Sequence, residues 1–213
     1  KVNTVSLEDL RAVTNKGIRA VQDFLEAQAT SVVEEQPKEG GGTVQQKLKK
    51  MVVGKTLYTW EEGAERAAAG TLTSVAKSNL SKKLVDSVGE VNFLKGPNVM
   101  DSFWAKEYNK PGFVSAATGG GGKMTVYNNE SVGPSTIAHE AAHNLAEKIW
   151  GSMTPDEHSN YARAQKKEKP VSSYGAIHPR EDWAEAVGLY ETDRATFKKK
   201  FPLKYAAVEE MLR

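Results

Sequence analysis

Two histidines lie four residues apart in STIAHEAAHNLAEKIW, residues 135–150, and a glutamate directly follows the first of them. On a helix, residues four apart share one face and are separated by about 6 Å along the axis, so His139 and His143 can bind one Zn²⁺ together. Glu140 lies one position round the helix, where its carboxylate can reach a water molecule beside the metal without being a ligand. This H-E-x-x-H pattern predicts two zinc ligands and a general base for hydrolysis.

The same segment also fits an ordinary amphipathic helix, in which both histidines lie on the surface or are hydrogen-bonded in the core. Its apolar residues recur at helical spacing and would form a core stripe without any metal: Ile137, Ala138, Ala141, Leu145 and Ile149. The chain contains only 4 His, so chance rarely places two of them around a glutamate at this spacing. We therefore prefer the zinc interpretation.

A catalytic zinc site has three protein ligands and one open position. The chain has no Cys, so the third ligand must be His, Asp or Glu. A third histidine six residues after the second is excluded, because that position is Ile149. His158 and His178 each stand alone in a polar stretch. Glu181 and Glu185 lie four apart on a predicted helix, so one can bind zinc while the other holds a ligating imidazole; a solvated acidic helix start is the alternative.

Two further motifs continue the pattern: SSYG at 172–175 and REDWAEAVGLY at 180–190. Together with HEAAH, they resemble the family of the anthrax toxin lethal factor catalytic domain and the clostridial Pro-Pro endopeptidases. In that family a tyrosine lies seven positions before the ligating glutamate of an E-x-x-A-E motif. The resemblance covers roughly residues 112–213, and the first part of the chain shares with the family only its helical character.

Carried over by position, the resemblance implies that Glu181 is the third zinc ligand and that Glu185 holds a ligating imidazole. It implies that the phenol of Tyr174 stabilises the oxyanion. The family usually carries Phe-Phe where this chain has Asp182 and Trp183, so Asp182 is expected either to replace a core-facing apolar residue or to point to solvent.

The resemblance implies a zinc-dependent endopeptidase of the gluzincin type, which hydrolyses a peptide or protein substrate with one Zn²⁺ per chain. In such zincins the substrate pairs as an extra strand with the edge strand before the zinc helix. We expect that edge in GGGGKMTVYNN, residues 119–129, and expect the following residues to bind substrate: Gly121, Gly122, Lys123, Met124 and Thr125. A flexible hairpin or loop is the alternative for the four glycines.

The remaining pattern predicts an α+β, zincin-like fold, mostly helical, with a small twisted sheet. We expect an N-terminal helical segment and Gly-rich loop over 1–43, which could belong to the same domain, and a catalytic domain over 44–213. The zinc helix is expected at about 134–150 and the third-ligand helix at about 179–191. The sequence segment that contains the third-ligand helix is 178–193. The other expected helices cover 6–35, 44–52, 60–70, 74–88, 153–169 and 201–212, and the expected strands cover 90–94, 112–117 and 123–128.

Composition excludes few functions. The net charge is +2 over 213 residues, and no long apolar run occurs, so we expect neither a nucleic-acid nor a membrane partner. We expect a monomer, secreted from a bacterium or, as the second interpretation, associated with a virion. Trp104 and Tyr108 are expected in the core, with a cleft border as the alternative.

Two other functions stay open. One is a virion structural protein that carries a peptidase-like domain. The other is a non-catalytic, zinc-stabilised binding module, for which a fourth ligand such as His178 would be needed.

Overall fold

A mixed β-sheet runs through the computed structural model, which describes residues 1–37 and 40–213. Seven strands pair in the described residues, in the order β1-β3-β4-β5-β7-β6, with β2 also paired to β3. The strands are β1 Thr4–Val5, β2 Thr30–Pro37, β3 Thr43–Val53, β4 Thr56–Glu61, β5 Glu90–Phe93, β6 Ala117–Gly120 and β7 Lys123–Val126. The pairs β1–β3, β4–β5 and β5–β7 are parallel, and the others are antiparallel.

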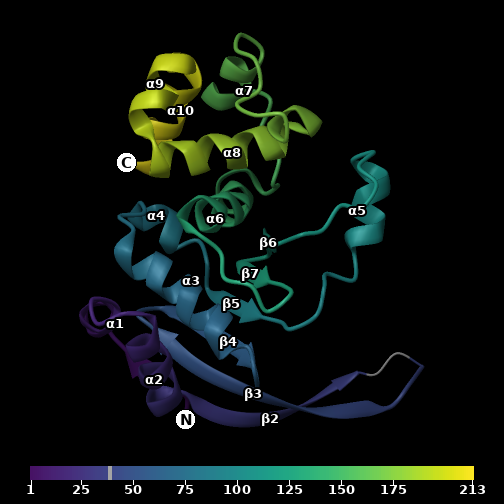
Figure 1. Cartoon of the computed structure of the whole chain (residues 1–213). Coiled ribbons are helices and arrows are strands. Elements are labelled where there is room, and N and C mark those ends of the chain that lie inside the picture. Colours follow the sequence, from purple (N-terminus) through teal and green to yellow (C-terminus); the bar gives the residue numbers. More distant parts are fainter. Residues whose placement is uncertain (38–39) are drawn as a thin grey trace.

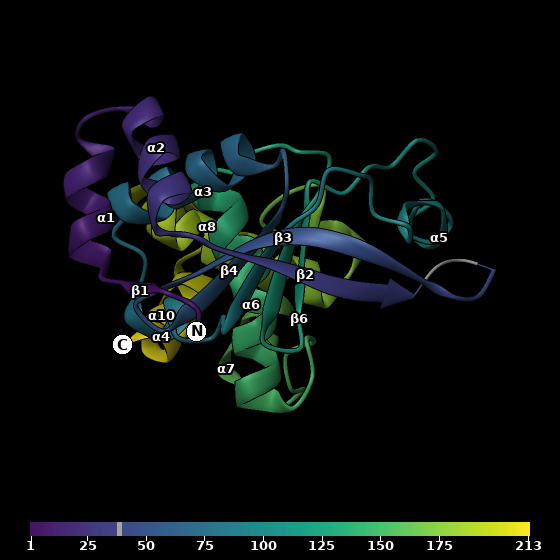
Figure 2. The same cartoon turned by 90° about the horizontal axis from the view of Figure 1, so that it is seen from below.

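The helices form layers on the sheet. They are α1 Leu7–Thr14, α2 Ile18–Gln28, α3 Glu65–Lys77, α4 Lys82–Val85, α5 Asp101–Glu107, α6 Pro134–Trp150, α7 Asn160–Gln165, α8 Pro179–Thr192, α9 Arg194–Lys200 and α10 Pro202–Leu212, with a short 3₁₀ turn at Gly175–Ile177. Figure 1 shows α3 and α6 above the sheet and α8 above α6. Seen from below in Figure 2, the strands lie in front of these helices.

One apolar core joins the sheet to these helices. Its largest fully buried side chains include Trp60 and Phe93 from the sheet, Leu72 from α3 and Trp183 from α8. The architecture is therefore α+β, as predicted, although the sheet is larger than expected. None of the helices in the described residues combines the length and the apolar character needed to cross a membrane.

Helix α6 has the predicted bounds. Pro134 occupies its first turn after Gly133, where a missing N–H costs nothing. Gly151 ends it in the left-handed conformation (φ +70°) and donates its N–H to the carbonyl of Glu147. Helix α8 also begins at its predicted residue, Pro179, and ends at Thr192.

The prediction of one long helix over 6–35 is wrong. Gly17, at φ +99°, separates α1 from α2, and β2 follows at Thr30. The segment expected as a helix over 44–52 is also a strand, because β3 pairs with β2 on one side and β4 on the other. Its Gln and Lys residues favour a helix locally, but strand pairing overrides that preference. The Gly-rich loop expected at the end of the segment 1–43 includes residues 38–39, which lie outside the described part.

The helix expected over 60–70 was predicted to end at Gly70, but this glycine lies inside α3. A Cβ there would approach the Cβ of Ser131 to 2.5 Å, so the glycine allows the chain before α6 to pass close to α3. The strand expected over 112–117 begins only at Ala117, and the helix expected over 153–169 is limited to α7, capped by Ser159.

The edge strand expected over 119–129 is correct for Gly119 and Gly120, which belong to β6, and wrong for the residues expected to bind substrate. Strand β7 carries Lys123, Met124 and Thr125, and it pairs with β5 on one side and β6 on the other, so its backbone is already committed. Gly121 and Gly122 form the turn between β6 and β7. Within the described residues, β6 is the last strand on this side of the sheet.

Candidate metal centre

Helices α6 and α8 bring the predicted ligands together because they pack closely. The indole N–H of Trp183 on α8 donates to the carbonyl of Ala142 on α6 at 2.9 Å. Further along, Gly188 meets Ser135: a Cβ at this glycine would lie 3.3 Å from the Ser135 carbonyl oxygen. These two contacts fix both the spacing and the register of the helices.

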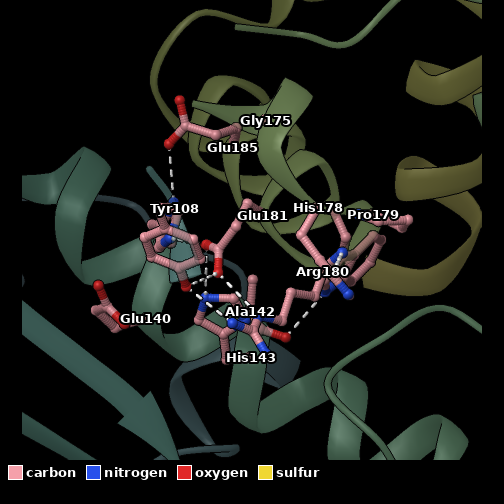
Figure 3. Close-up of polar contacts among 12 residues, drawn as sticks. Tyr108, Glu140, Ala142, His143, Gly175, His178, Pro179, Arg180, Glu181 and Glu185 are labelled. Carbon is pink, nitrogen blue, oxygen red and sulfur yellow. Dashed lines mark hydrogen bonds and ion pairs between the residues drawn. The ribbon is translucent and has the colours of Figure 1, made fainter. Parts of the chain in front are cut away.

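Three side chains converge at this contact. The Oε2 atom of Glu181 lies 3.2 Å from Nε2 of His139 and 3.3 Å from Nε2 of His143. All three residues are buried, and within the described residues they form a group able to hold a metal ion. Figure 3 shows the Glu181 carboxylate directed toward His143. The packing of α6 on α8 therefore brings His139, His143 and Glu181 into one cluster, as the sequence predicted.

The other oxygen of Glu181 is held by two residues that the sequence analysis did not assign. Arg180 Nε donates to Oε1 at 3.0 Å, and the Tyr108 hydroxyl donates to the same atom at 3.2 Å. An Arg180 terminal nitrogen also donates to the Tyr108 hydroxyl at 2.8 Å. These bonds turn Oε2 toward the histidines. Burial alone would raise the pKa of Glu181, but its hydrogen bonds with His139 and His143 outweigh burial and lower that pKa well below its usual range.

Glu185 holds His139 from the side opposite Glu181. Its Oε1 lies 2.8 Å from Nδ1 of His139, and its Oε2 accepts a hydrogen bond from Ser172 at 2.7 Å. Burial lowers the pKa of His139, but the hydrogen bonds with Glu181 and Glu185 outweigh it and raise that pKa to about 10. These two carboxylates, one at each ring nitrogen, therefore favour the protonated form of His139.

His143 is held differently. Its Nδ1 atom is buried and has no hydrogen-bond partner among the described residues. Its ring packs edge-on against the ring of His139, with centroids 5.0 Å apart. His143 is therefore oriented by its single contact with Glu181 and by packing, whereas His139 is held by a carboxylate at each ring nitrogen.

Glu140 lies beside the cluster and outside it. In Figure 3 its carboxylate stands apart from Glu181, and no dashed contact joins it to the other residues drawn. Burial raises the pKa of Glu140. Strand β6 passes directly over this point of α6: a Cβ at Gly119 would lie 2.1 Å from the Glu140 carbonyl oxygen.

A pocket of about 350 Å³ opens over the cluster, lined by His139, Glu140 and Tyr174 among others. The Tyr174 ring lies 5.8 Å from the His139 ring, between centroids. Burial raises the pKa of Tyr174, so the phenol keeps its proton and can donate it in a hydrogen bond. The structure thus brings Tyr174 to the same pocket as the three clustered residues.

Trp104 and Tyr108 line this pocket and are not buried in the core. The expectation that they are core residues is wrong, and the alternative, that they border a cleft, is confirmed. The Trp104 ring stacks on Tyr108 and receives the Arg180 guanidinium at 5.3 Å from its centroid. No sequence pattern joins Tyr108 to Glu181, 73 positions later. The proximity arises from the path of the chain after α5.

The other histidines are elsewhere. The Nδ1 atom of His178 accepts the backbone N–H of Arg180 and so caps α8. His158 is exposed beside Glu157. Neither belongs to the cluster found in the described residues.

No protein-family model matches the sequence, and no curated protein matches it. What the site can do is therefore inferred from its residues and their geometry.

Proposed function

We propose that the protein is a zinc-dependent endopeptidase of the zincin type. The observation that carries this proposal is the convergence of His139, His143 and Glu181 beneath a pocket that Glu140 also lines. Such a set offers three metal ligands and a separate general base, as hydrolytic zinc sites have.

The donor set fits zinc. Two ligand atoms at 2.0–2.1 Å from a tetrahedral ion lie about 3.3 Å from each other. The two nitrogen-to-oxygen distances, 3.2 and 3.3 Å, match that separation. Two imidazoles and one carboxylate are a common ligand set of catalytic zinc, which supplies polarisation of a carbonyl and activation of water when it is bound.

The chain's own groups then divide the proton transfers. Glu140 accepts the proton of the attacking water and later delivers it to the leaving amine. Burial raises its pKa above that of an exposed glutamate, which makes the protonated carboxyl easier to form and so favours the return of the proton. The Tyr174 hydroxyl donates a hydrogen bond to the oxygen that gains negative charge in the transition state.

We place the peptide substrate along β6 rather than along residues 121–125. Strand β6 ends the sheet over Glu140, and its outer backbone groups can pair with an extended peptide. A peptide bound there would present a carbonyl to the pocket between Glu140 and Tyr174.

A purely structural zinc module is less well supported. Such a site is closed by a fourth protein ligand, and the residue that could have supplied it, His178, instead caps α8.

The test is cleavage of a diverse peptide library by the zinc-loaded protein, followed by mass spectrometry. Glu140→Gln should lower the cleavage rate by about 10²–10⁴-fold while zinc content stays unchanged. Glu130→Gln, at an exposed glutamate, is the matched control and should cleave normally. Equal cleavage by Glu140→Gln and wild type would overturn the proposal.

A further inference from the structure

Asp182 is almost fully buried, at 3% exposed, although it follows the ligand Glu181 on α8. It neither packs as an apolar residue nor points to solvent, the two expectations for this position. Its partner is Lys204 on α10, which is 1% exposed. The Lys204 ammonium lies 2.8 Å from Oδ2 and 3.1 Å from Oδ1 of Asp182, and it also donates to the Lys169 carbonyl at 2.7 Å.

The remaining capacity of the Asp182 carboxylate is also used. Oδ1 accepts the backbone N–H of Val171 at 2.8 Å. Oδ2 accepts from Gln165 at 2.9 Å and from the Tyr161 hydroxyl at 3.2 Å. One carboxylate thus joins α7, α8, α10 and the segment between α7 and α8.

That segment, residues 169–175, leads into the candidate site. One residue after Val171, the Ser172 hydroxyl donates to Glu185, which in turn holds His139. Tyr174 follows two positions later and lines the pocket. Gly175 packs tightly on α8, since a Cβ there would lie 3.1 Å from the Asp182 Cα atom.

A buried ion pair of this kind needs a reason other than stability, because a well-packed apolar pair often stabilises a fold as much or more. Here the pair fixes the path of the backbone, because Lys204 donates a hydrogen bond to the Lys169 carbonyl and Asp182 accepts one from the Val171 N–H. Both ends of the short stretch before Ser172 are therefore fixed, which an apolar pair could not do.

We propose that the Asp182–Lys204 pair positions the 169–175 segment, so that Ser172 stays bonded to Glu185 and Tyr174 stays in the pocket. Asp182 and Lys204 act through these residues and touch no substrate. The consequence for turnover rests on the proposed endopeptidase function, whereas the positioning itself does not.

The positioning is tested by hydrogen–deuterium exchange on the zinc-loaded full chain. Asp182→Asn and Lys204→Met should raise amide exchange in 169–175 by about tenfold or more, while α6 keeps wild-type protection. Lys200→Met, at an exposed lysine, is the control and should change nothing. Unchanged exchange in 169–175, or an equal rise along the whole chain, would overturn the proposal.

A charged partner left alone in the core could prevent folding, so Asp182→Leu/Lys204→Met serves as the second variant. It removes both charges and the anchors of the segment while it keeps the core filled. We expect a folded protein whose 169–175 segment still exchanges at least about tenfold faster than in wild type. Wild-type protection of the segment would contradict the proposal.

Turnover supplies a further readout that general loss of stability would not produce. At saturating zinc, the double variant should lower kcat by about tenfold or more with little change in KM, because the Tyr174 hydrogen bond acts in the transition state. In a Tyr174→Phe background the same two substitutions should cause no further loss. Independent, multiplying losses would refute positioning through Tyr174.

Absence of cleavage by the wild type would instead refute the proposed function, and the exchange result would then decide the positioning alone.

Discussion

His139 engages both of its ring nitrogens with carboxylates, whereas His143 engages one. Both ring nitrogens of His139 can donate a hydrogen bond at the same time only when the ring is protonated. The two carboxylates therefore favour the protonated ring and raise the pKa of His139. A metal ligand must present a lone pair. The proton on Nε2 and a metal ion therefore compete for the same atom.

Metal affinity should consequently rise with pH. Below the His139 pKa of about 10, each bound metal ion displaces the Nε2 proton, so affinity should gain up to about tenfold per pH unit between pH 6 and 9. Competition with a chelator at several pH values, corrected for the chelator's own protonation, measures this. An affinity that stays constant across the range would contradict the account of His139.

The hydrogen bonds behind His139 should also govern affinity. Glu185→Gln or Ser172→Ala should weaken zinc binding by about 10–100-fold, because an unsupported imidazole is a less basic and less well oriented ligand. Titration against a chelator at pH 7.5 reports the change. His158→Ala, at an exposed histidine, is the control; an equal effect there would exclude a specific role for Glu185.

The candidate ligands could be predicted from the sequence because their spacing fits single helices. His139, Glu140 and His143 lie within one turn of α6, and the candidate Glu181 and Glu185 lie within one turn of α8. Which glutamate faces the histidines came only from a resemblance. Arg180 and Tyr108 carried no such signal, since their contact joins segments 72 positions apart.

At the scale of elements, β6 and α6 approach each other closely at one glycine. Gly119→Ala would place a Cβ 2.1 Å from the Glu140 carbonyl oxygen, and neither backbone can give way cheaply. We expect a destabilisation of about 1–3 kcal/mol, seen as a lower melting temperature, and a loss of peptide cleavage as the edge strand moves away. Gly96→Ala, which meets nothing within 4 Å, is the control. A stable, fully active Gly119→Ala would show that this contact does not position β6.

Helices α6 and α8 could be predicted, since each begins with a proline in its first turn, but the strands β2 and β3 were missed. Thr30, Val32 and Val33 are β-branched and did offer a strand signal in β2. β3 offered little, because its Gln and Lys residues favour a helix and its strand form depends on partners on both sides. Its pairing is a property of the sheet and not of the segment.

At the scale of the whole molecule, the candidate ligands join α6, which packs on the sheet, to α8, which packs on α6. A metal ion held by both helices binds the folded state and not the unfolded chain. Free zinc at about 100 times its Kd should then stabilise the fold by about 2.7 kcal/mol, or roughly 5–10 °C in melting temperature for a chain of this size. Calorimetry with and without chelator tests this; an unchanged melting temperature would contradict a site that bridges the two helices.

The fold class was predictable, and the extent of the sheet was not. An α+β arrangement followed from strand patterns directly before a strongly helical region. The N-terminal residues were expected to be helical, yet they add β1 and β2 to the same sheet that ends at β6. Only long-range pairing determines that outcome.

The most direct measurement is the metal content of purified protein, by mass spectrometry, for wild type, Glu181→Ala and Glu185→Ala after equal exposure to zinc and removal of excess. The arrangement of His139, His143 and Glu181 predicts about one zinc ion per chain in the wild type, a reduced but measurable content in Glu185→Ala, and none in Glu181→Ala. Zinc retained in Glu181→Ala and lost in Glu185→Ala, or absent from the wild type, would contradict it.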